Sequence, residues 1–206
     1  MFNLQRRVEI TNETQASAVE NLRVASYLSS KSFKVIDEDE VKSYCKWNEK
    51  DAQGLVLIAL NEHNEVISTL RANIYFEETE LIKNNPIFKQ ATDNFVEYPV
   101  LDLTIAATNP AYFQSGILSA LRYYMYILHR HTVKTITGVA VKNSSIYKSL
   151  SNFGYEFIDV DTVGKDVVPS DCWTIAKLSS VKFDNAINLI RSKYNKTIMN
   201  YPLIIK

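Results

Sequence analysis

The stretch from residue 101 to residue 155 constrains the fold more than any other part of this chain. Residues 101–107 (LDLTIAA) are mostly apolar, as in a central strand that is buried on both faces. Asn109-Pro110 interrupts this run, and apolar residues then recur with helical spacing over residues 117–131. A second apolar run, residues 136–141, follows the helix. Strand, helix and strand in this order predict a right-handed crossover between two parallel strands.

The junction between the first strand and the long helix is the place where such a unit binds ligands. The unpaired amides of a helix N-terminus attract anions without help from a basic side chain. The turn that enters the helix consists of Phe113, Gln114, Ser115, Gly116 and Ile117. We therefore expect a binding site at this turn.

The rest of the chain predicts antiparallel strands before the crossover and a strand pair after it. Residues 55–60 and 65–74 form a hairpin around the turn at 61–64. The other expected elements are an edge strand within 1–10, helices over 13–29 and 183–194, a short helix that ends near Asn84, a second short helix from the caps at 143–145 to Gly154, a strand pair over 156–160 and 172–178, and a last edge strand within 201–205. Residues 30–50, with the acidic run 37–40, are interpreted as an irregular charged segment. This order predicts a mixed α/β fold in a single domain, residues 1–206.

The composition excludes several classes of function. The chain has 23 basic and 23 acidic residues, and this balance favours neither nucleic acid nor an anionic membrane as a partner. Its apolar runs are too short to span a bilayer, and residues 1–7 lack the apolar core of a secretion signal. Cys45 and Cys172 form no disulfide framework, so we expect a cytoplasmic protein with two inert thiols. Zinc-ligand spacing, a Walker loop and a nucleophile elbow are absent, and no metal is predicted.

The segment around the crossover resembles the cofactor-binding core of the GNAT acyltransferase superfamily. The matching residues are Asn109-Pro110, Gly116-Ile117, Asn143 and the later Gly154-Tyr155. The resemblance implies a central mixed sheet with antiparallel N-terminal strands and helices on both faces. It implies an acyl thioester of coenzyme A or of acyl-carrier-protein phosphopantetheine as the donor substrate, with no permanently bound cofactor.

Each part of this core has an implied role toward the donor. Residues 113–117 and Asn143 would hold it, and the acyl chain would run between the splayed fourth and fifth strands. Amides of Ile105, Ala106 and Ala107 would hold the thioester oxygen at a bulge in the fourth strand, where oriented amides stabilise an oxyanion. For Asn143, a helix cap is the competing interpretation.

A second resemblance is to acyl-homoserine lactone synthases and long-chain N-acyl amino acid synthases. These enzymes share a sparse pattern of an Arg with an aromatic residue four positions on, an acid before a strand, an Arg closing the next strand, and an acid on the fourth strand. The chain offers Arg23 with Tyr27, then Asp51 in the segment that begins at Trp47, then Arg71, and then Asp102 with Thr104. The resemblance implies that these residues shape the sites for the acceptor and the acyl group.

Asp102 is the first candidate for the general base that takes a proton from the attacking amine. The competing interpretation is a structural acid that bonds to a turn or to a basic side chain, and the sequence does not separate the two. Glu97 is the second candidate, on a loop next to Pro99. Arg71 could bind an acceptor carboxylate or pair with Asp51 or Asp102. Trp47 is more typical of a core anchor than of a substrate platform.

These observations predict an N-acyltransferase that moves an acyl group, which can be long-chain, from a thioester to a primary amine such as an amino acid. One alternative is a binding module with this fold and no catalysis. It is favoured by Phe113 and Leu118 in the turn and by Leu150, since these positions usually carry Gln or Arg, Gly or Ala, and a Tyr acid in the family. The other alternative is an acyl-homoserine lactone synthase.

Overall fold

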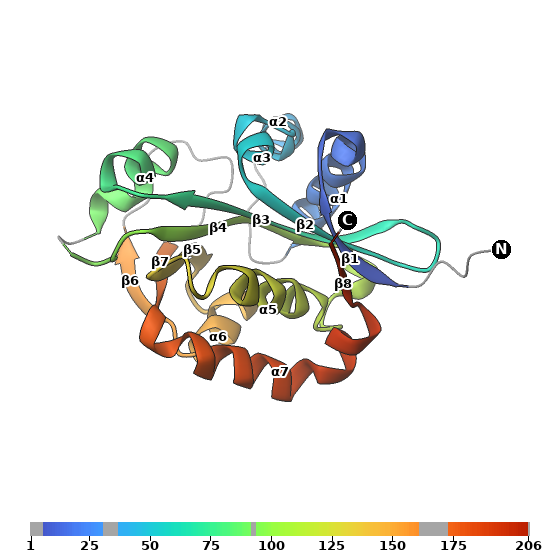
Figure 1. Cartoon of the computed structure of the whole chain (residues 1–206). Helices are drawn as coiled ribbons and strands as arrows, with labels where there is room; N and C mark the ends of the chain where they lie inside the picture. The colour runs from blue at the N-terminus through green and yellow to red at the C-terminus, as the bar shows by residue number, and fades with distance from the viewer. Residues whose placement is uncertain (1–5, 31–36, 92–93, 161–172, 206) are drawn as a thin grey trace.

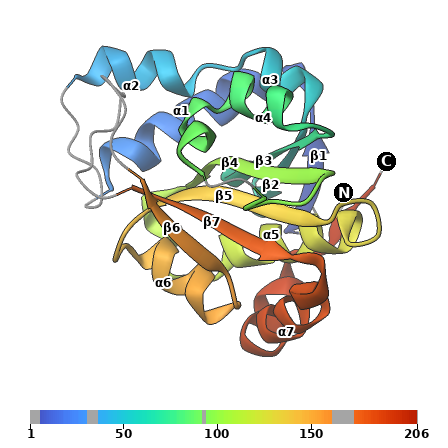
Figure 2. The ribbon, with the colours of Figure 1, turned by 90° about the vertical axis from the view of Figure 1, so that its left-hand side faces the viewer.

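The architecture is a twisted eight-stranded sheet with helices packed on both faces (Figures 1 and 2). It was obtained as a computed structural model that describes residues 6–30, 37–91, 94–160 and 173–205. The strands are β1 (Arg7–Thr11), β2 (Leu55–Leu60), β3 (Val66–Tyr75), β4 (Val100–Thr108), β5 (Thr135–Val141), β6 (Glu156–Val160), β7 (Trp173–Ser179) and β8 (Leu203–Ile204). The α-helices are α1 (Ala16–Leu28), α2 (Glu38–Cys45), α3 (Glu49–Gln53), α4 (Glu78–Asn84), α5 (Ile117–His129), α6 (Ser145–Asn152) and α7 (Phe183–Asn200). Short 3-10 turns η1 (Glu13–Gln15), η2 (Pro86–Gln90), η3 (Pro110–Tyr112) and η4 (Ser180–Lys182) complete the elements.

The sheet is mixed, with strand order β6-β7-β5-β4-β3-β2-β1-β8. Strands β1 to β4 pair antiparallel in sequence order, β4 and β5 pair parallel, and β7 pairs antiparallel with both β5 and β6. The parallel pair is joined through α5, as the predicted crossover requires. The predicted GNAT-like fold class is therefore confirmed.

The two helical layers are different in origin. Helices α1 to α4, from the first half of the chain, cover one face of the sheet, and α5, α6 and α7 cover the other (Figures 1 and 2). The main apolar core lies on the α5 side and includes Leu57, Leu70, Leu101 and Tyr126, all of them 0–1% exposed. The α1–α4 side carries smaller apolar clusters, and between them lies a strip of polar strand residues.

The segment predicted to be irregular, residues 30–50, is the main error of the sequence interpretation. It contains α2 and the beginning of α3. The acidic run begins α2, and Asp37 caps the helix by accepting from the amide of Asp39 at 2.8 Å. Three acids occupy the first turn, where their negative charge interacts favourably with the positive end of the helix dipole. Only Val41 and Cys45 of α2 are buried, which is why hydrophobic periodicity did not reveal it.

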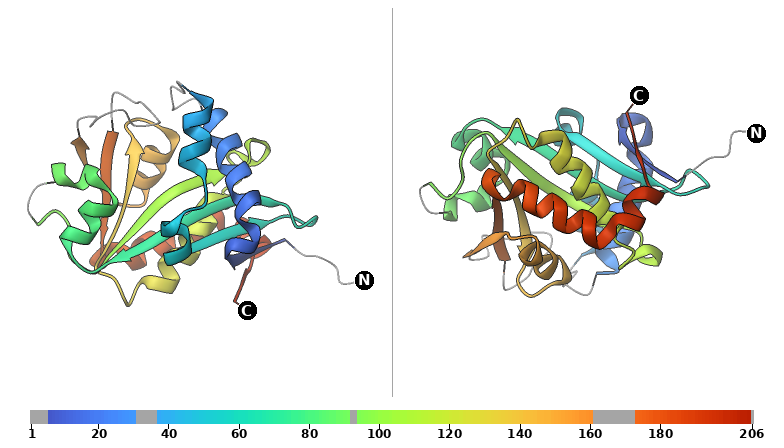
Figure 3. Two further views of the ribbon diagram at one scale, coloured as in Figure 1. Left: turned by 90° about the horizontal axis from the view of Figure 1, so that it is seen from above. Right: turned by 60° about the horizontal axis from the view of Figure 1, so that its bottom comes forward.

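At the C-terminal end, the helix predicted over 183–194 continues to Asn200, with non-helical dihedral angles at Tyr194. The sequence prediction thus ended at the residue where the helix kinks. Viewed from below, α7 runs across α5 (Figure 3). The Tyr124 hydroxyl ties the two helices by donating to the carbonyls of Ile198 and Tyr201, both at 3.0 Å.

Candidate active site

A buried ion-pair network connects α1, α3 and β3. Arg23 of α1 is 0% exposed and binds both carboxylate oxygens of Asp51, at 2.5 and 3.1 Å. Asp51 also accepts from the amide of Asn48 and so closes a capping box at the start of α3. Arg71 of β3 lies 3.4 Å from the same carboxylate. One carboxylate thus compensates two guanidinium groups and fixes α1 and α3 over the sheet.

The register of β3 and β4 places the remaining predicted polar residues side by side. Arg71 faces Thr104 and Asn73 faces Asp102 across the two strands. The Arg71 Nε donates to the Thr104 hydroxyl at 2.8 Å, so the strands are linked through side chains as well as backbone. The predicted pairing of Arg71 with Asp51 is present. The pairing engages part of the Arg71 guanidinium group, which leaves fewer of its N–H groups for an acceptor carboxylate.

Asp102 is the buried acid of this polar strip, with 1% of its surface exposed. Its carboxylate accepts from the Thr137 hydroxyl of β5 at 3.0 Å and from the Asn85 side-chain amide at 3.3 Å. Burial raises the pKa of the Asp102 carboxyl above its ordinary value, and the two hydrogen bonds and the charges of Arg71 and Lys50 oppose this rise. A carboxyl group with a raised pKa is suited to accept a proton near neutral pH.

A polar cavity of about 170 Å³ lies on the same face of the sheet, one strand away from Asp102. Asn73, which pairs with Asp102 across the strands, lines it together with Lys50, Gln53, Ile74, Tyr75, Glu80 and Asn84. Burial lowers the pKa of the Lys50 amine, whose Nζ donates to the Asn84 carbonyl. The cavity offers a cation, an anion and side-chain amides, so it suits a small polar molecule.

Two of the sequence candidates lie apart from this group. Glu97 is exposed on the loop before β4 and contacts Thr135 through its backbone. Trp47 is half-buried and packs on the cluster of Val19, Ile58 and Leu60, as expected for a core anchor. Within the described part of the chain, neither residue forms a hydrogen bond or ion pair with Asp102 or Arg71.

Tyr27 lies elsewhere again, close to the predicted oxyanion strand. It is 8% exposed and belongs to the apolar cluster of Ile105, Val41 and Cys45, and its ring lies 5.7 Å from that of Tyr44. Burial raises the pKa of the Cys45 thiol to about 11, so this cysteine is an unreactive packing residue, as predicted. Cys172 lies outside the described residues.

The predicted bulge in β4 is present at Ile105 and Ala106. These two residues stand opposite Leu70 alone, because the register shifts between Arg71–Thr104 and Thr69–Ala107. Ile105 has a φ of 43°, which is strained for a β-branched residue. Pairing of β4 with β5 ends at Leu103 and Gly138, so residues 104–108 have no partner on β5. The two strands therefore part at the bulge, as the fold resemblance implied.

The turn that enters α5 has the left-handed conformation that such a loop needs. Gln114 has a φ of 66° and Gly116 a φ of 81°. A Cβ atom on Gly116 would lie 2.5 Å from the Tyr194 ring of α7, and the Thr197 hydroxyl donates to the Ser115 carbonyl at 3.1 Å. Phe113 is 45% exposed. The kinked end of α7 therefore supports the turn on one side.

The start of α6 corrects one of the alternatives for Asn143. Ser144, and not Asn143, caps the helix by accepting from the amide of Tyr147 at 3.1 Å. Asn143 has a φ of 64° and forms part of the preceding turn. Leu150 is buried, and the ring of Tyr147 packs on Phe157 with centroids 4.2 Å apart. Neither position supplies the Tyr acid of the common acetyltransferases.

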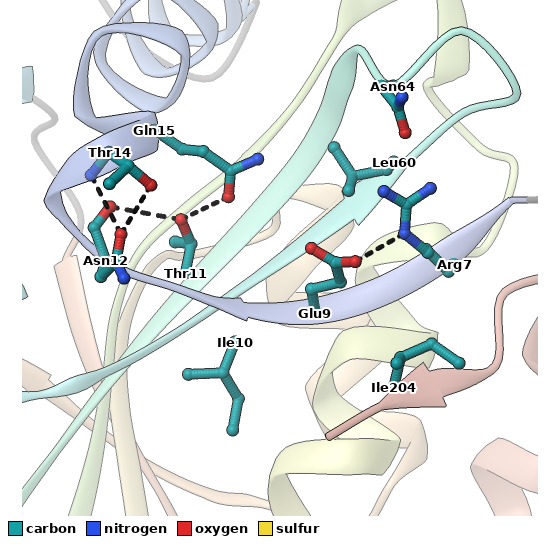
Figure 4. Close-up of a pocket in the computed structure, with 10 residues that line it drawn as sticks. All are labelled: Arg7, Glu9, Ile10, Thr11, Asn12, Thr14, Gln15, Leu60, Asn64 and Ile204. Carbon is teal, nitrogen blue, oxygen red and sulfur yellow. Dashed lines mark hydrogen bonds and ion pairs between the residues drawn. The ribbon is translucent and has the colours of Figure 1, made fainter. Parts of the chain in front are cut away.

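A larger cavity of about 650 Å³ lies at the other end of the sheet, beside β1 (Figure 4). Arg7 and Glu9 of β1 form an ion pair at its floor at 2.6 Å, and Thr11, Asn12 and Gln15 lie at one end. Sequence reasoning did not point to any of its lining residues, and β2 and β3 separate β1 from β4. It is therefore distinct from the Asp102 site.

Several residues of the Asp102 site escaped the sequence interpretation. Lys50, Asn85 and Thr137 come from three separate segments and carry no shared pattern that could have grouped them. Asn73 shares a face of β3 with Arg71, and no motif in the sequence distinguishes it from an ordinary strand residue. Among the described residues, no group of His, Cys, Asp and Glu could hold a metal ion, and no helix is long and apolar enough to cross a membrane.

Comparison with known proteins supports the fold and no closer relationship. No protein-family model matches the chain, and no curated protein matches it. The solved structures similar to it include the CoA-dependent acyl-homoserine lactone synthase BjaI with SAM and isopentyl-CoA, at 10% identity over 98% of this chain and 92% of that one, with a TM-score of 0.62. They also include yncA, a putative acetyltransferase from Salmonella typhimurium with acetyl-CoA, at 12% identity over 85% and 94%, with a TM-score of 0.57.

Proposed function

We propose that this chain, which has the GNAT fold, is an N-acyltransferase that transfers an acyl group from a thioester to a primary amine such as an amino acid. The observation that carries the proposal is the arrangement along β4. One strand bears the buried Asp102, the bulge at Ile105 beside the parting from β5, and the turn that enters α5. An acid, a strand with unused pairing capacity and a helix N-terminus are the parts that this reaction needs.

In the proposed reaction the thioester carbonyl lies at the bulge, where amides of Ile105, Ala106 and Ala107 stabilise the developing oxyanion. The amine enters from the cavity lined by Asn73 and Lys50, and Asp102 accepts its proton as the new carbon–nitrogen bond forms. The thiolate of coenzyme A or of a carrier-protein phosphopantetheine leaves. The donor is a substrate, held by the turn at residues 113–117 and by Asn143.

Arg71 and its partners position the acceptor side of the site. The guanidinium group is held by Asp51, Asn48 and Thr104, which fixes its direction on β3. Arg23 and Asp51 act through this network and not on the substrate. Tyr27 packs against Ile105 and supports the bulge from the α1 side. These assignments separate positioning residues from Asp102, the proposed catalytic base.

The experiment is an assay of thiol release from acyl-CoA in the presence and absence of amines. Amine-dependent release by the wild-type protein, with kcat/KM about a hundredfold or more lower in Asp102→Asn, is the expected result. Glu97→Gln is the matched control, because its carboxylate is exposed outside the strand, and it should retain wild-type activity. Equal activity in Asp102→Asn would rule out the proposed base, and absence of activity with every acyl donor would favour the binding module.

An acyl-homoserine lactone synthase is the second candidate, because the likeness to BjaI extends over 98% of this chain. In this chain the position three residues after Asp102 is Ile105, where the lactone synthases have an Arg, and Ile105 is buried in an apolar cluster. An amino acid acceptor is therefore preferred over SAM. Formation of a lactone from SAM would reverse this preference.

A further inference from the structure

A buried guanidinium group on α5 has no counter-ion in the structure. Arg122 is 5% exposed, yet it has no ion pair and no hydrogen bond to any residue in the described ranges. The other two buried arginines, Arg23 and Arg71, are both compensated by Asp51. A charge removed from water is costly when it is unpaired, so Arg122 needs an explanation.

The surroundings of Arg122 supply hydroxyl groups but no acid. Tyr126, one turn further along α5, and Tyr155, at the start of β6, form a buried hydrogen bond of 2.5 Å between their hydroxyls. Arg122 lies close enough to both to lower their pKa values against the larger rise caused by burial. The acid next to Tyr155 is Glu156, which is engaged by Lys177 and Lys182 at the surface. No acid among the described residues is paired with Arg122, so an anion from outside the chain can supply the missing counter-charge.

The position of Arg122 indicates where that anion would lie. Helical side chains lean toward the N-terminus of their helix, so Arg122 leans toward Ser119, which is 6% exposed in the first turn of α5. That turn carries the helix amides without intrahelical partners. The nearness to Tyr155, which follows α6, places Arg122 on the side of α5 that faces the α6–β6 junction. Beyond Leu103, β4 leads to α5 and β5 leads to α6, so the N-termini of both helices lie at the end of the sheet where these strands part.

The guanidinium group is also accessible, although narrowly. In Arg23 the Nε atom is buried from solvent and has no hydrogen-bond partner. None of the three guanidinium nitrogens of Arg122 is both unpartnered and fully buried in this way. The small exposed fraction of Arg122 is therefore shared by its charged end. An anion can reach the group without unfolding of the helix.

We propose that Arg122 binds a phosphate of the thioester donor, as a second anion contact beside the amides of the α5 turn. This inference rests on the proposed function and identifies the donor as one whose phosphate is required for binding. It also accounts for Phe113 in the turn, since the positive charge is supplied one turn further along the helix. Two donors carry such a phosphate: coenzyme A and the phosphopantetheine arm of a carrier protein.

The test measures the dissociation constants of coenzyme A, 4′-phosphopantetheine and pantetheine for the whole chain by calorimetry. Wild-type protein should bind the phosphorylated ligands more tightly than pantetheine, and Arg122→Met should reduce this preference by about tenfold to a hundredfold. Arg122→Lys should keep part of it. Arg130→Met is the matched control, since Arg130 is an exposed arginine on the same helix that contacts Asp184 at 3.7 Å.

Melting without ligand separates binding from a structural role. Because the unpaired charge is removed, Arg122→Met should melt no lower than the wild type, whereas loss of a structural arginine would lower the melting temperature. A phosphate preference retained in Arg122→Met would overturn the inference. Wild-type binding without any phosphate preference would do the same and leave the proposed function intact, and failure of all three ligands to bind would refute both. A preference for coenzyme A alone would assign the contact to a nucleotide phosphate, and an equal preference for 4′-phosphopantetheine to the arm shared with carrier proteins.

Discussion

At the scale of single residues, Asp51 and Asp102 show how burial divides two carboxylates between different tasks. Asp51 meets Arg23 and Arg71 and a backbone amide, so its charge is fully used by the fold. Asp102 meets only neutral donors, Thr137 and Asn85, and burial raises its pKa. The first carboxylate is engaged by two guanidinium groups and a backbone amide, and the second has the raised pKa that suits it to exchange a proton.

Replacement of Asp51 by Ala should destabilise the protein strongly. The change leaves two buried guanidinium groups without compensation, which costs about 3–5 kcal/mol of the free energy of unfolding. Urea denaturation measures this loss. Glu62→Gln removes a carboxylate from an exposed pair with Arg6 and should leave the midpoint close to that of the wild type. Similar midpoints for the two variants would contradict the account of the network.

Asp102 should also set the acid limb of the pH–rate profile. The base acts only when it is deprotonated, so kcat/KM should rise with pH through a pKa higher than that of an ordinary Asp. Asp102→Asn should lose this limb together with most of the activity. A limb that persists in Asp102→Asn at the same pH would show that another group titrates.

The same shift predicts the pH dependence of stability. Between the ordinary pKa and the raised pKa, the folded protein holds a proton that the unfolded chain has released. The free energy of unfolding should therefore fall as the pH rises through this window. The Asp102→Asn variant should lack this contribution to the fall. Melting temperatures of both proteins across the window measure the difference.

At the scale of elements, the sequence predicted those segments whose burial follows a simple period. The β2 strand and the start of α5 were predicted to the residue, because each packs one continuous apolar run or stripe into the core. Helix α2 was missed because it buries only two side chains. The burial of Arg23 could not be predicted from its own helix, since it depends on Asp51, which is 28 positions away. Lys50, Asn85 and Thr137 were missed for the same reason.

The bulge in β4 leads to a prediction about Ile105. Removal of its buried side chain in Ile105→Ala should cost about 2–5 kcal/mol, but Ala also keeps the strained φ. Gly relieves that strain, so Ile105→Gly should be at least as stable as Ile105→Ala. Ile58 in β2 is the control, because Gly there should be about 0.5–1 kcal/mol worse than Ala. If urea denaturation shows the Gly variant to be less stable than the Ala variant at position 105 as well as at position 58, the bulge is not strained.

The turn before α5 can be tested through its glycine. Gly116→Ala combines an unfavourable φ with a Cβ atom that meets the Tyr194 ring at 2.5 Å. Gly154→Ala, at a φ of 88° with no atom within 4 Å of the new Cβ, has the strain alone, about 1–2 kcal/mol. We expect Gly116→Ala to be the less stable variant in urea, and Tyr194→Ala to recover part of the difference. Equal losses for the two glycines would argue against close support of the turn by α7.

At the scale of the whole molecule, the sheet divides the proposed reaction between its two sides. Arg71, Asp102 and Lys50, proposed for the acceptor, contact segments of the α1–α4 layer. The turn and Arg122, proposed for the donor, belong to α5, which covers the other face of the sheet (Figure 2). The two sides can meet where β4 parts from β5, beyond Leu103 and Gly138. The order of elements along the chain and the crossover were predicted from the sequence, and the resemblance implied that the fourth and fifth strands splay. The residues at which they part depend on register and became visible only in the structure.

The measurement that tests the central claim most directly is mass spectrometry of the products formed from acyl-CoA and a mixture of amino acids. The account predicts an N-acyl amino acid whose formation requires the protein and is lost in Asp102→Asn. A parallel incubation with SAM would yield a lactone if the second candidate were right. Release of free acid without any amide, or recovery of the intact donor at all chain lengths from both acyl-CoA and acyl carrier protein, would contradict the assignment of this fold to acyl transfer.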